Sequence, residues 1–331
     1  MMLPGLAISS ARRMVAATVA LALCMGSSAQ AADKVRLILD WAWLPYHAAF
    51  LYARDRGYFT EAGLDVTIEQ GRGSATSALM LAHGDFDLGH INITNAAQAI
   101  GKGLPLKTVA VYQHKTAAAF IGIKGKVKLT DAQSLKGLRV GSTPGGSDQF
   151  SLQVFSAVTK VEPSDMKIVS LNADAKNTAL LTGTVDVISG DAPAFEAQVK
   201  AAGMEPEVLS IGDLGVPLIG FGFVANKAFL DKNGAAIPKF LRAARHGFAD
   251  MAADPKAACE YMRVKVDALT PEQSCLIYLA GMARLSTPPT DPSWGHQTDE
   301  EWTKLVGALR AIGQIPDGME PSAFYTHEFE P

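Results

Sequence analysis

The chain has 331 residues, and its 30 Lys and Arg against 33 Asp and Glu give a formal net charge of −3. A chain of this charge has no basic excess for binding nucleic acid. A hydrophobic content of 48% and a charged content of 19% are typical of a folded globular protein. The length suffices for one large domain or two medium ones, each with a core of its own.

The N-terminus has the three parts of a cleaved export signal. Arg12 and Arg13 precede an apolar run that ends at Met25, and small residues follow as far as Ala31. The apolar run is well short of the roughly 18 residues that a stable membrane-spanning helix needs. We therefore expect residues 1–31 to be a signal peptide and the mature chain to enter the periplasm.

Two cysteines, Cys259 and Cys275, remain after the signal and would enter an oxidising compartment. Both lie in helix-like sequence, on either side of a predicted turn at residues 269–274. A disulfide between two helices is possible there. Two buried free thiols fit the same spacing equally well.

Strand-like apolar runs alternate with helical patterns along the chain. The first series has strand-like runs at 35–40, 64–70, 86–91 and 106–113, with helices near 47–62 and 74–83. A second series has strand-like runs at 117–124, 138–142, 166–171 and 185–190, with helices near 149–159 and 174–182. A last apolar run at 218–229 precedes sequence that is helical from 236 to 313. The alternation predicts parallel strands with helical crossovers.

The restart of this pattern predicts two α/β lobes. Strand-like crossings near residues 120–124 and 221–226 would connect the lobes as hinges. We therefore expect residues 32–121 and 223–331 in lobe 1 and residues 122–222 in lobe 2. A pair of lobes joined by two hinge strands suits closure around a ligand.

The candidate ligand-binding residues of lobe 1 follow its predicted strands, because open α/β sheets bind ligands at the carboxyl edge. They are Trp41, Tyr46 and His47 after the first strand, Gly73 and Ser74 after the second, and Asn92 and Thr94 after the third. An indole can stack on a flat solute, and the amide and hydroxyl groups offer neutral donors and acceptors. For His47 and Ser74, a role in capping a helix is the alternative.

In lobe 2 a glycine-rich loop joins a predicted strand to a helix. Gly146, Ser147 and Asp148 of this loop can surround an oxygen-rich group. The loop lacks the Lys of a phosphate-binding P-loop, and Asp148 in the first helical turn would repel an anion or cap the helix. Asp191 and Glu196 follow the last strand of the lobe and can accept hydrogen bonds from an amine or a ring N–H.

Motifs of catalysis are absent from the sequence. It contains no G-x-S-x-G, no H-E-x-x-H, no C-x-x-C and no full dinucleotide fingerprint. We therefore expect no catalytic residue, no metal and no cofactor.

Several motifs in order give the chain a family resemblance. The motif D-W-x5-H at Asp40, Trp41 and His47 is followed by GYFTEAGLDVTI, the turn HGDFDLG and the ending FYTHEFEP. From about Val35 to Pro331 the chain resembles the solute-binding family related to thiamine-pyrimidine synthesis proteins. The family includes binders of taurine, alkanesulfonates, nitrate and pyrimidine precursors. The resemblance implies an α/β periplasmic binding protein fold of the second type, with a small-molecule ligand delivered to an ABC permease and its ATPase.

Within this resemblance, Trp41 and His47 match the aromatic residue and the His of the first loop. Glu196 falls near an acidic residue that pyrimidine-binding relatives use. Leu44 and Tyr46, however, occupy positions where those relatives tend to carry Asn. These departures argue against a pyrimidine ligand. The aromatic and amide side chains of the predicted site favour a small aromatic or heteroaromatic compound, with or without one carboxylate.

The same resemblance includes a second functional class. This class is a pyrimidine-forming enzyme that consumes its own His and an attached cofactor and carries a clustered cysteine motif. The present sequence has no such cysteine cluster. We therefore expect a monomeric binding protein that is not an enzyme, with the pyrimidine-forming enzyme as the alternative.

Overall fold

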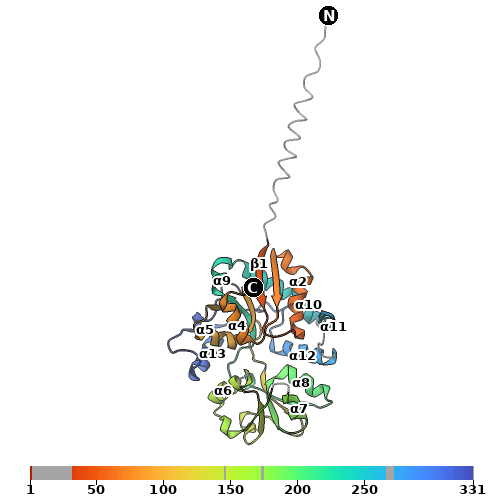
Figure 1. Cartoon of the computed structure of the whole chain (residues 1–331), viewed down its shortest axis with the longest axis vertical. Coiled ribbons are helices and arrows are strands. Elements are labelled where there is room, and N and C mark those ends of the chain that lie inside the picture. Colours follow the sequence, from red (N-terminus) through yellow and green to blue (C-terminus); the bar gives the residue numbers. More distant parts are fainter. Residues whose placement is uncertain (2–31, 145–146, 173–174, 266–271, 331) are drawn as a thin grey trace.

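The computed structural model describes residues 1, 32–144, 147–172, 175–265 and 272–330. Two lobes lie one above the other along the long axis of the molecule (Figure 1), and each contains one five-stranded sheet. The predicted signal peptide lies outside the described residues, apart from Met1. The two-lobed α/β architecture predicted from the alternating pattern is confirmed.

The sheet of lobe 1 has the strand order β2-β1-β3-β10-β4. Its strands are β1 (Asp33–Ile38), β2 (Leu64–Glu69), β3 (Leu88–Asn92), β4 (Leu106–Val111) and β10 (Phe221–Asn226). Strand β1 is parallel to β2 and β3, whereas β10 is antiparallel to β3 and β4. The helices of this lobe are η1 (Pro45–His47), α2 (Ala48–Asp55), α3 (Tyr58–Glu61), α4 (Ser74–His83), α5 (Ile93–Gly101), α9 (Lys227–Asn233) and α10 (Ala236–Ala253).

The sheet of lobe 2 repeats this topology in the order β7-β6-β8-β5-β9. Its strands are β5 (Ala118–Ile123), β6 (Arg139–Ser142), β7 (Lys167–Ser170), β8 (Val187–Asp191) and β9 (Pro206–Ser210). Strand β6 is parallel to β7 and β8, and β5 is antiparallel to β8 and β9. The helices are α6 (Ser147–Thr159), α7 (Ala175–Leu181) and α8 (Ala192–Ala201), with short turns η2 (Ala132–Leu135), η3 (Pro163–Asp165) and η4 (Gly212–Leu214).

The predicted lobe boundaries need a correction, because neither predicted hinge strand is a hinge. Strand β5 pairs on both sides within the sheet of lobe 2, and β10 pairs on both sides within the sheet of lobe 1. The chain instead crosses between the lobes at residues 112–117 and 211–220. An apolar run indicates a buried strand, but it does not indicate to which of two sheets the strand belongs.

The two crossovers are hydrogen-bonded to each other. The Thr116 N–H donates to the Leu218 carbonyl over 3.1 Å, and the Gly220 N–H donates to the Gln113 carbonyl over 3.0 Å. The buried Gln113 side chain accepts from the Phe221 N–H over 3.0 Å. A Cβ at Gly220 would lie 2.2 Å from Gln113 Oε1, so a glycine is needed here for the close approach. The crossovers therefore form one joint between the lobes.

The C-terminal helices contact both lobes. They are α11 (Pro255–Lys265), α12 (Glu272–Leu285) and α13 (Asp299–Ala311), followed by the turn η5 (Pro321–Ala323). Helix α12 lies between the lobes (Figure 1) and packs against α8, while α13 packs against α6. Gly281 of α12 faces Pro193 of α8, where a Cβ would approach a proline carbon to 2.8 Å. The absence of a side chain at Gly281 allows the two helices to pack closely.

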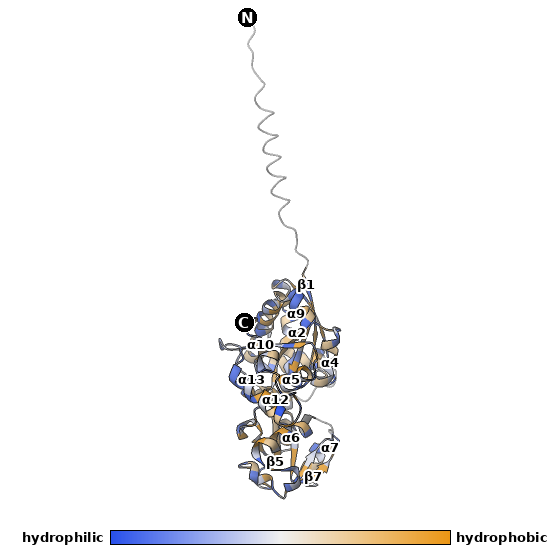
Figure 2. Cartoon of the chain, turned by 90° about the vertical axis from the view of Figure 1, so that its left-hand side faces the viewer, coloured by the Kyte–Doolittle hydropathy of each residue, from blue (hydrophilic) through white to orange (hydrophobic). Residues whose placement is uncertain are grey.

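Hydrophobic side chains fill the interior of each lobe. The ribbon coloured by hydropathy shows many hydrophilic residues on the outer loops and helices (Figure 2). The largest fully buried side chains include Trp294, Trp302, Phe50, Phe223 and Phe155. Helices cover the parallel strands, so the strands read as apolar runs. Among the described helices, none has both the length and the apolar character needed to cross a bilayer.

A disulfide joins Cys259 on α11 to Cys275 on α12 across a sequence separation of 16 residues. Of the two alternatives that the sequence leaves open, the structure has the bonded pair. Both cysteines are buried in a cluster with Tyr46 and Met262. The bond therefore attaches the helix that contacts lobe 2 to the core of lobe 1.

Replacing both cysteines, by Cys259→Ser together with Cys275→Ser, removes this cross-link. We expect a loss of about 3 kcal/mol in the free energy of unfolding, because closing a loop of this length restricts the unfolded chain. Urea denaturation measures the loss, and the wild-type protein treated with a reductant provides the control. An unchanged urea midpoint in both samples would contradict the structural role of the bond.

Candidate ligand-binding site

The carboxyl edges of the parallel strands face the opposite lobe. Strand β4 ends at Val111, and the first crossover leaves from this end for lobe 2. Strand β9 ends at Ser210, and the second crossover leaves from there for lobe 1. The carboxyl ends of β1 and β3 in one lobe, and of β6 and β8 in the other, therefore lie at the junction of the lobes. Open α/β sheets place ligands at these edges.

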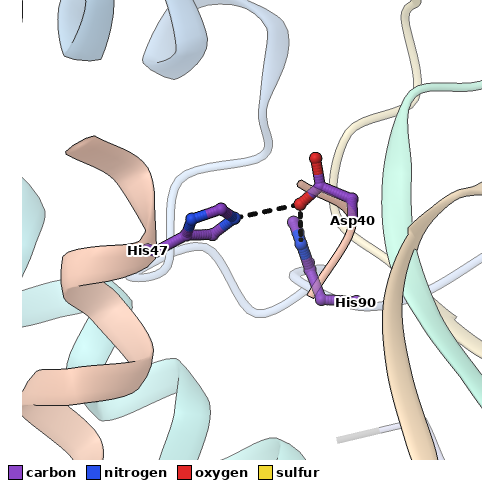
Figure 3. Close-up of side chains that lie close together, drawn as sticks. All are labelled: Asp40, His47 and His90. Carbon is purple, nitrogen blue, oxygen red and sulfur yellow. Dashed lines mark hydrogen bonds and ion pairs between the residues drawn. The ribbon is translucent and has the colours of Figure 1, made fainter. Parts of the chain in front are cut away.

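A buried carboxylate, Asp40, lies just after β1 and receives hydrogen bonds from three side chains. His47 Nε2 is 3.0 Å from Asp40 Oδ1, His90 Nδ1 is 2.9 Å from the same oxygen, and the Tyr46 hydroxyl donates to Oδ2 over 2.6 Å. Figure 3 shows both imidazoles directed at the one carboxylate oxygen. His90 Nε2 is also 2.6 Å from the Tyr112 hydroxyl on the far side.

The electrostatics of this cluster favour an ionised Asp40. Burial by itself would raise the pKa of the Asp40 carboxyl, but the hydrogen bonds from His47 and His90 hold that pKa well below its usual range. Burial lowers the pKa of His47 and raises the pKa of Tyr46 far above its ordinary value. The buried negative charge of Asp40 is thus satisfied by three hydrogen-bond donors.

The atoms of Asp40, His47 and His90 lie close enough together to hold a metal ion, within 4.8 Å of one another. The hydrogen-bond pattern argues against that use. His47 Nδ1 accepts the Leu44 N–H over 3.0 Å, so the proton of a neutral imidazole must be on Nε2, which faces Asp40. A nitrogen that carries a proton offers no lone pair to a metal. The cluster is therefore a hydrogen-bonded support beneath the junction.

The structure shows His47 and Tyr46, both predicted to contact a ligand, engaged in contacts within the protein. His47 is 0% exposed and both of its nitrogens are engaged. The Tyr46 side chain is also buried, and its hydroxyl is committed to Asp40. Both residues help to hold the chain at the end of β1 in place, because each is hydrogen-bonded to the buried Asp40 carboxylate.

Trp41 is different, since it is 51% exposed at the end of β1. A Cβ at Gly73 would lie 3.3 Å from the indole, so the ring lies against the chain at the start of α4. The Gly73 N–H donates to the Asp40 carbonyl, and the Gly71 N–H donates to the Trp41 carbonyl. Gly73 has a φ of 115°, which favours glycine. Backbone hydrogen bonds therefore hold the chain at Trp41 in place, while about half of the residue stays accessible.

The other polar candidates of lobe 1 hold the framework together. Gly73, not Ser74, is the N-cap of α4, and the Ser74 hydroxyl accepts the Asn92 N–H over 3.1 Å. The Asn92 side chain caps α5 by accepting the Asn95 N–H. Thr94 is buried, and its hydroxyl both donates to the Ile219 carbonyl and accepts the Ile219 N–H. In this conformation the Thr94 hydroxyl binds the second crossover, and its contact with a ligand stays a prediction.

In lobe 2, Gly146 lies outside the described residues, and Ser147 and Asp148 form the first turn of α6. Glu196 forms an ion pair with Arg284 of α12, with a shortest N–O distance of 3.0 Å. Asp191 ends β8 and caps α8 by accepting the Ala194 N–H over 2.9 Å. Burial, with Asp40 and Glu196 nearby, raises the pKa of Asp191 to about 6.

Four residues of this region were not predicted from the sequence: His90, Tyr112, Phe221 and Tyr278. The His90 ring lies 5.0 Å from Phe221, and the Tyr46 ring lies 5.9 Å from Tyr278. His90 lies within a strand-like apolar run, and Tyr278 lies in a helix far along the chain. Of these four residues, only His90 could have been predicted from the sequence. An imidazole inside a buried strand needs a polar partner.

A fold of two α/β lobes connected by two crossovers, with candidate ligand residues where the lobes meet, is that of periplasmic binding proteins. The chain belongs to the NMT1/THI5 like family, whose model matches residues 44–258. Among curated proteins it is similar to a 4-amino-5-hydroxymethyl-2-methylpyrimidine phosphate synthase, THI13, of Saccharomyces cerevisiae. The two are 24% identical over 309 residues, which cover 90% of this chain and 88% of the yeast protein. The synthase of Uromyces fabae is 22% identical over 315 residues, covering 90% and 87%.

Solved structures support the fold. The periplasmic aliphatic sulphonate binding protein SsuA from Escherichia coli aligns with a TM-score of 0.70 and 16% identity, covering 88% of this chain and 91% of SsuA. The periplasmic nitrate-binding protein NrtA from Synechocystis PCC 6803 aligns with a TM-score of 0.66 and 15% identity, covering 90% and 87%. The fold predicted from the family resemblance is therefore confirmed.

The Asp40 cluster makes a testable prediction about stability. Asp40→Asn should lower the free energy of unfolding by about 3–5 kcal/mol at pH 7, because an amide cannot accept from both imidazoles and the hydroxyl as a carboxylate does. Chemical denaturation measures the change. Asp231→Asn, which breaks an exposed pair with Lys227, is the control and should cost less than about 1 kcal/mol.

The pH dependence of the same variant follows from the lowered pKa of Asp40. A carboxyl with a lowered pKa stabilises the folded state above its unfolded pKa, and this stabilisation is lost as the pH falls through the folded pKa. The stability difference between wild type and Asp40→Asn should therefore shrink below about pH 4. A constant difference from pH 7 to pH 3 would contradict the ionised state of Asp40.

Proposed function

We propose that the protein is the solute-binding component of an ABC importer and captures a small aromatic or heteroaromatic compound between its two lobes. The observation that carries this proposal is the exposed Trp41 indole, held on a rigid base at the carboxyl edge of the lobe 1 sheet. Asp191 lies at the corresponding edge of lobe 2. An exposed indole at the edge where open α/β sheets bind ligands suits stacking on a flat solute.

The proposal extends to the place and partners of the protein. The N-terminal pattern of residues 1–31 and the disulfide at Cys259 both suit an oxidising compartment, and we place the mature protein in the periplasm. There it would bind solute as a monomer and dock on a permease coupled to an ATPase. The joint formed by the two crossovers supports a closing motion of the lobes.

A pyrimidine-phosphate synthase is the second candidate function, since the curated relatives carry that name. Two observations favour binding over synthesis. The sequence has three cysteines, with no cluster among them, and two of them form the disulfide between Cys259 and Cys275. His47, the histidine of the first loop, is enclosed and hydrogen-bonded on both sides. An intact mass that is unchanged after prolonged incubation with a bound solute would support binding, whereas a change at a histidine would support synthesis.

Trp41→Ala tests the proposed function. The variant should bind aromatic solutes about tenfold or more weakly, because it loses both stacking and the burial of the indole. A thermal-shift screen of aromatic and heteroaromatic compounds identifies a solute, and calorimetric titration then compares its affinity for both proteins. Leu79→Ala, which removes another exposed apolar side chain, is the control and should keep wild-type affinity. Equal binding by Trp41→Ala and wild type would contradict the placement of the site.

A further inference from the structure

Asp191 has one carboxylate oxygen without a partner among the described residues. Its Oδ1 accepts the Ala194 N–H at the start of α8. No other hydrogen bond or ion pair reaches this side chain from the part of the chain that the structure describes. The residue is only partly buried. Its second oxygen is therefore available for a ligand at the carboxyl end of β8.

A second unpartnered polar group comes from α12. Tyr278 is 8% exposed, and its hydroxyl makes no hydrogen bond to any described residue. Solvent reaches part of the Tyr278 hydroxyl, because this atom is not one of the fully buried polar atoms without a partner in the described part of the chain. One turn further along α12, Gly281 contacts Pro193, two residues after Asp191. Burial raises the pKa of the Tyr278 hydroxyl well above its ordinary value, and the Asp191 charge raises it further.

The charges around these two groups are mainly negative. Asp40 and Glu196 are the charges that raise the pKa of Asp191 after burial itself. Glu196 is balanced by its ion pair with Arg284. The other nearby cation is Lys176 of α7, whose Nζ donates to the Ser189 carbonyl over 2.9 Å and lies 5.2 Å from the Phe195 ring centre.

Lys176 thus has bonds of its own, and its Nζ lies 3.5 Å from the position that a Cβ at Gly190 would take. A partly buried carboxylate beside a second carboxylate is unfavourable until a cation joins it. A metal ion would need more oxygen ligands than one carboxylate and one phenol supply, and Asp191 belongs to no group of described residues suited to a metal. An organic ammonium needs only two or three acceptors.

We propose that the solute carries a protonated amine, and that this amine binds the free Asp191 oxygen and the Tyr278 hydroxyl where β8 meets α12. This inference rests on the proposed function and adds the charge class of the solute. An aromatic amine would present its ring to the exposed Trp41 face while its ammonium lies against lobe 2. Closure of the lobes would then bring the two halves of the site together.

Aromatic compounds of similar shape but different charge test whether the site selects a protonated amine. Benzylamine, tyramine and phenethylamine carry a protonated nitrogen at neutral pH, whereas benzyl alcohol and benzoate have similar rings without one. Thermal shift with each compound, followed by calorimetric titration, should show binding of at least one amine and weaker binding of the alcohol and the benzoate. Binding of that amine should strengthen between pH 5 and pH 7, because Asp191, with its pKa raised to about 6, ionises in this range while the amine stays protonated.

Variants assign the effect to the two residues. Asp191→Asn keeps an oxygen that can cap α8 but loses the charge, and it should bind the amine about tenfold to a hundredfold more weakly. Tyr278→Phe should weaken binding by a smaller factor. Asp186→Asn, at the opposite end of β8 and paired with Arg139, is the matched control and should bind as wild type does. A thermal midpoint of Asp191→Asn at or above that of wild type would separate loss of binding from loss of folding.

Three results would overturn the inference: equal or tighter binding of the alcohol or the benzoate, no binding of any amine, or full amine affinity in Asp191→Asn. The proposed function is judged separately. If a neutral or anionic aromatic compound binds and Trp41→Ala abolishes its binding, the solute-binding proposal stands while the charge inference fails. If no aromatic compound binds, both fail.

Discussion

The ionised carboxylate of Asp40 is the constraint on which the rest of the site depends. A charge that is taken out of water must receive hydrogen bonds in return, and His47, His90 and Tyr46 provide them. These donors come from the turn η1 and from β3, so the carboxylate fixes the chain after β1 to the centre of the sheet. The backbone of Asp40 meets Gly73 in the same place. The indole of Trp41 is thereby held in position although about half of the residue is exposed.

Two features connect the lobes: the pair of hydrogen-bonded crossovers and helix α12. The crossovers bind each other through backbone hydrogen bonds and through Gln113, so one connected strip of chain joins the lobes. Helix α12 belongs to the lobe 1 core through its disulfide, yet it packs against α8 through Gly281. Helix α12 therefore connects the two lobes, and its Arg284 pairs with Glu196 of α8. The Tyr278 hydroxyl of the same helix has no hydrogen-bond partner among the described residues.

The sequence predicts the architecture well because strands, helices and their order are encoded locally. Runs at β1, β2 and α4 lie where the apolar periodicity places them, with α4 at residues 74–83 in both the prediction and the structure. Strand β9 was not predicted, because it is a half-exposed edge strand that begins with a proline. The hinges were misplaced because the sheet to which an apolar strand belongs depends on contacts between distant segments.

The candidate site is less predictable for the same reason. Position at a strand end makes Trp41 and Asp191 candidates, and their contact with a ligand stays a prediction. Burial decides which of the neighbouring polar groups face inward. His47 and Thr94 have the chemistry of ligand contacts and use it on the protein itself. Tyr278 joins the site from a helix nearly 240 residues after Trp41, and no local pattern connects the two.

Native mass spectrometry of the protein purified from the periplasm of its own host tests the central claim most directly. Solute capture between the lobes predicts a monomer that begins after Ala31, retains its disulfide and carries one small organic molecule that is released unchanged on denaturation. A chain that carries no small molecule under any growth condition, or one whose mass shows a chemically altered histidine, would contradict the account.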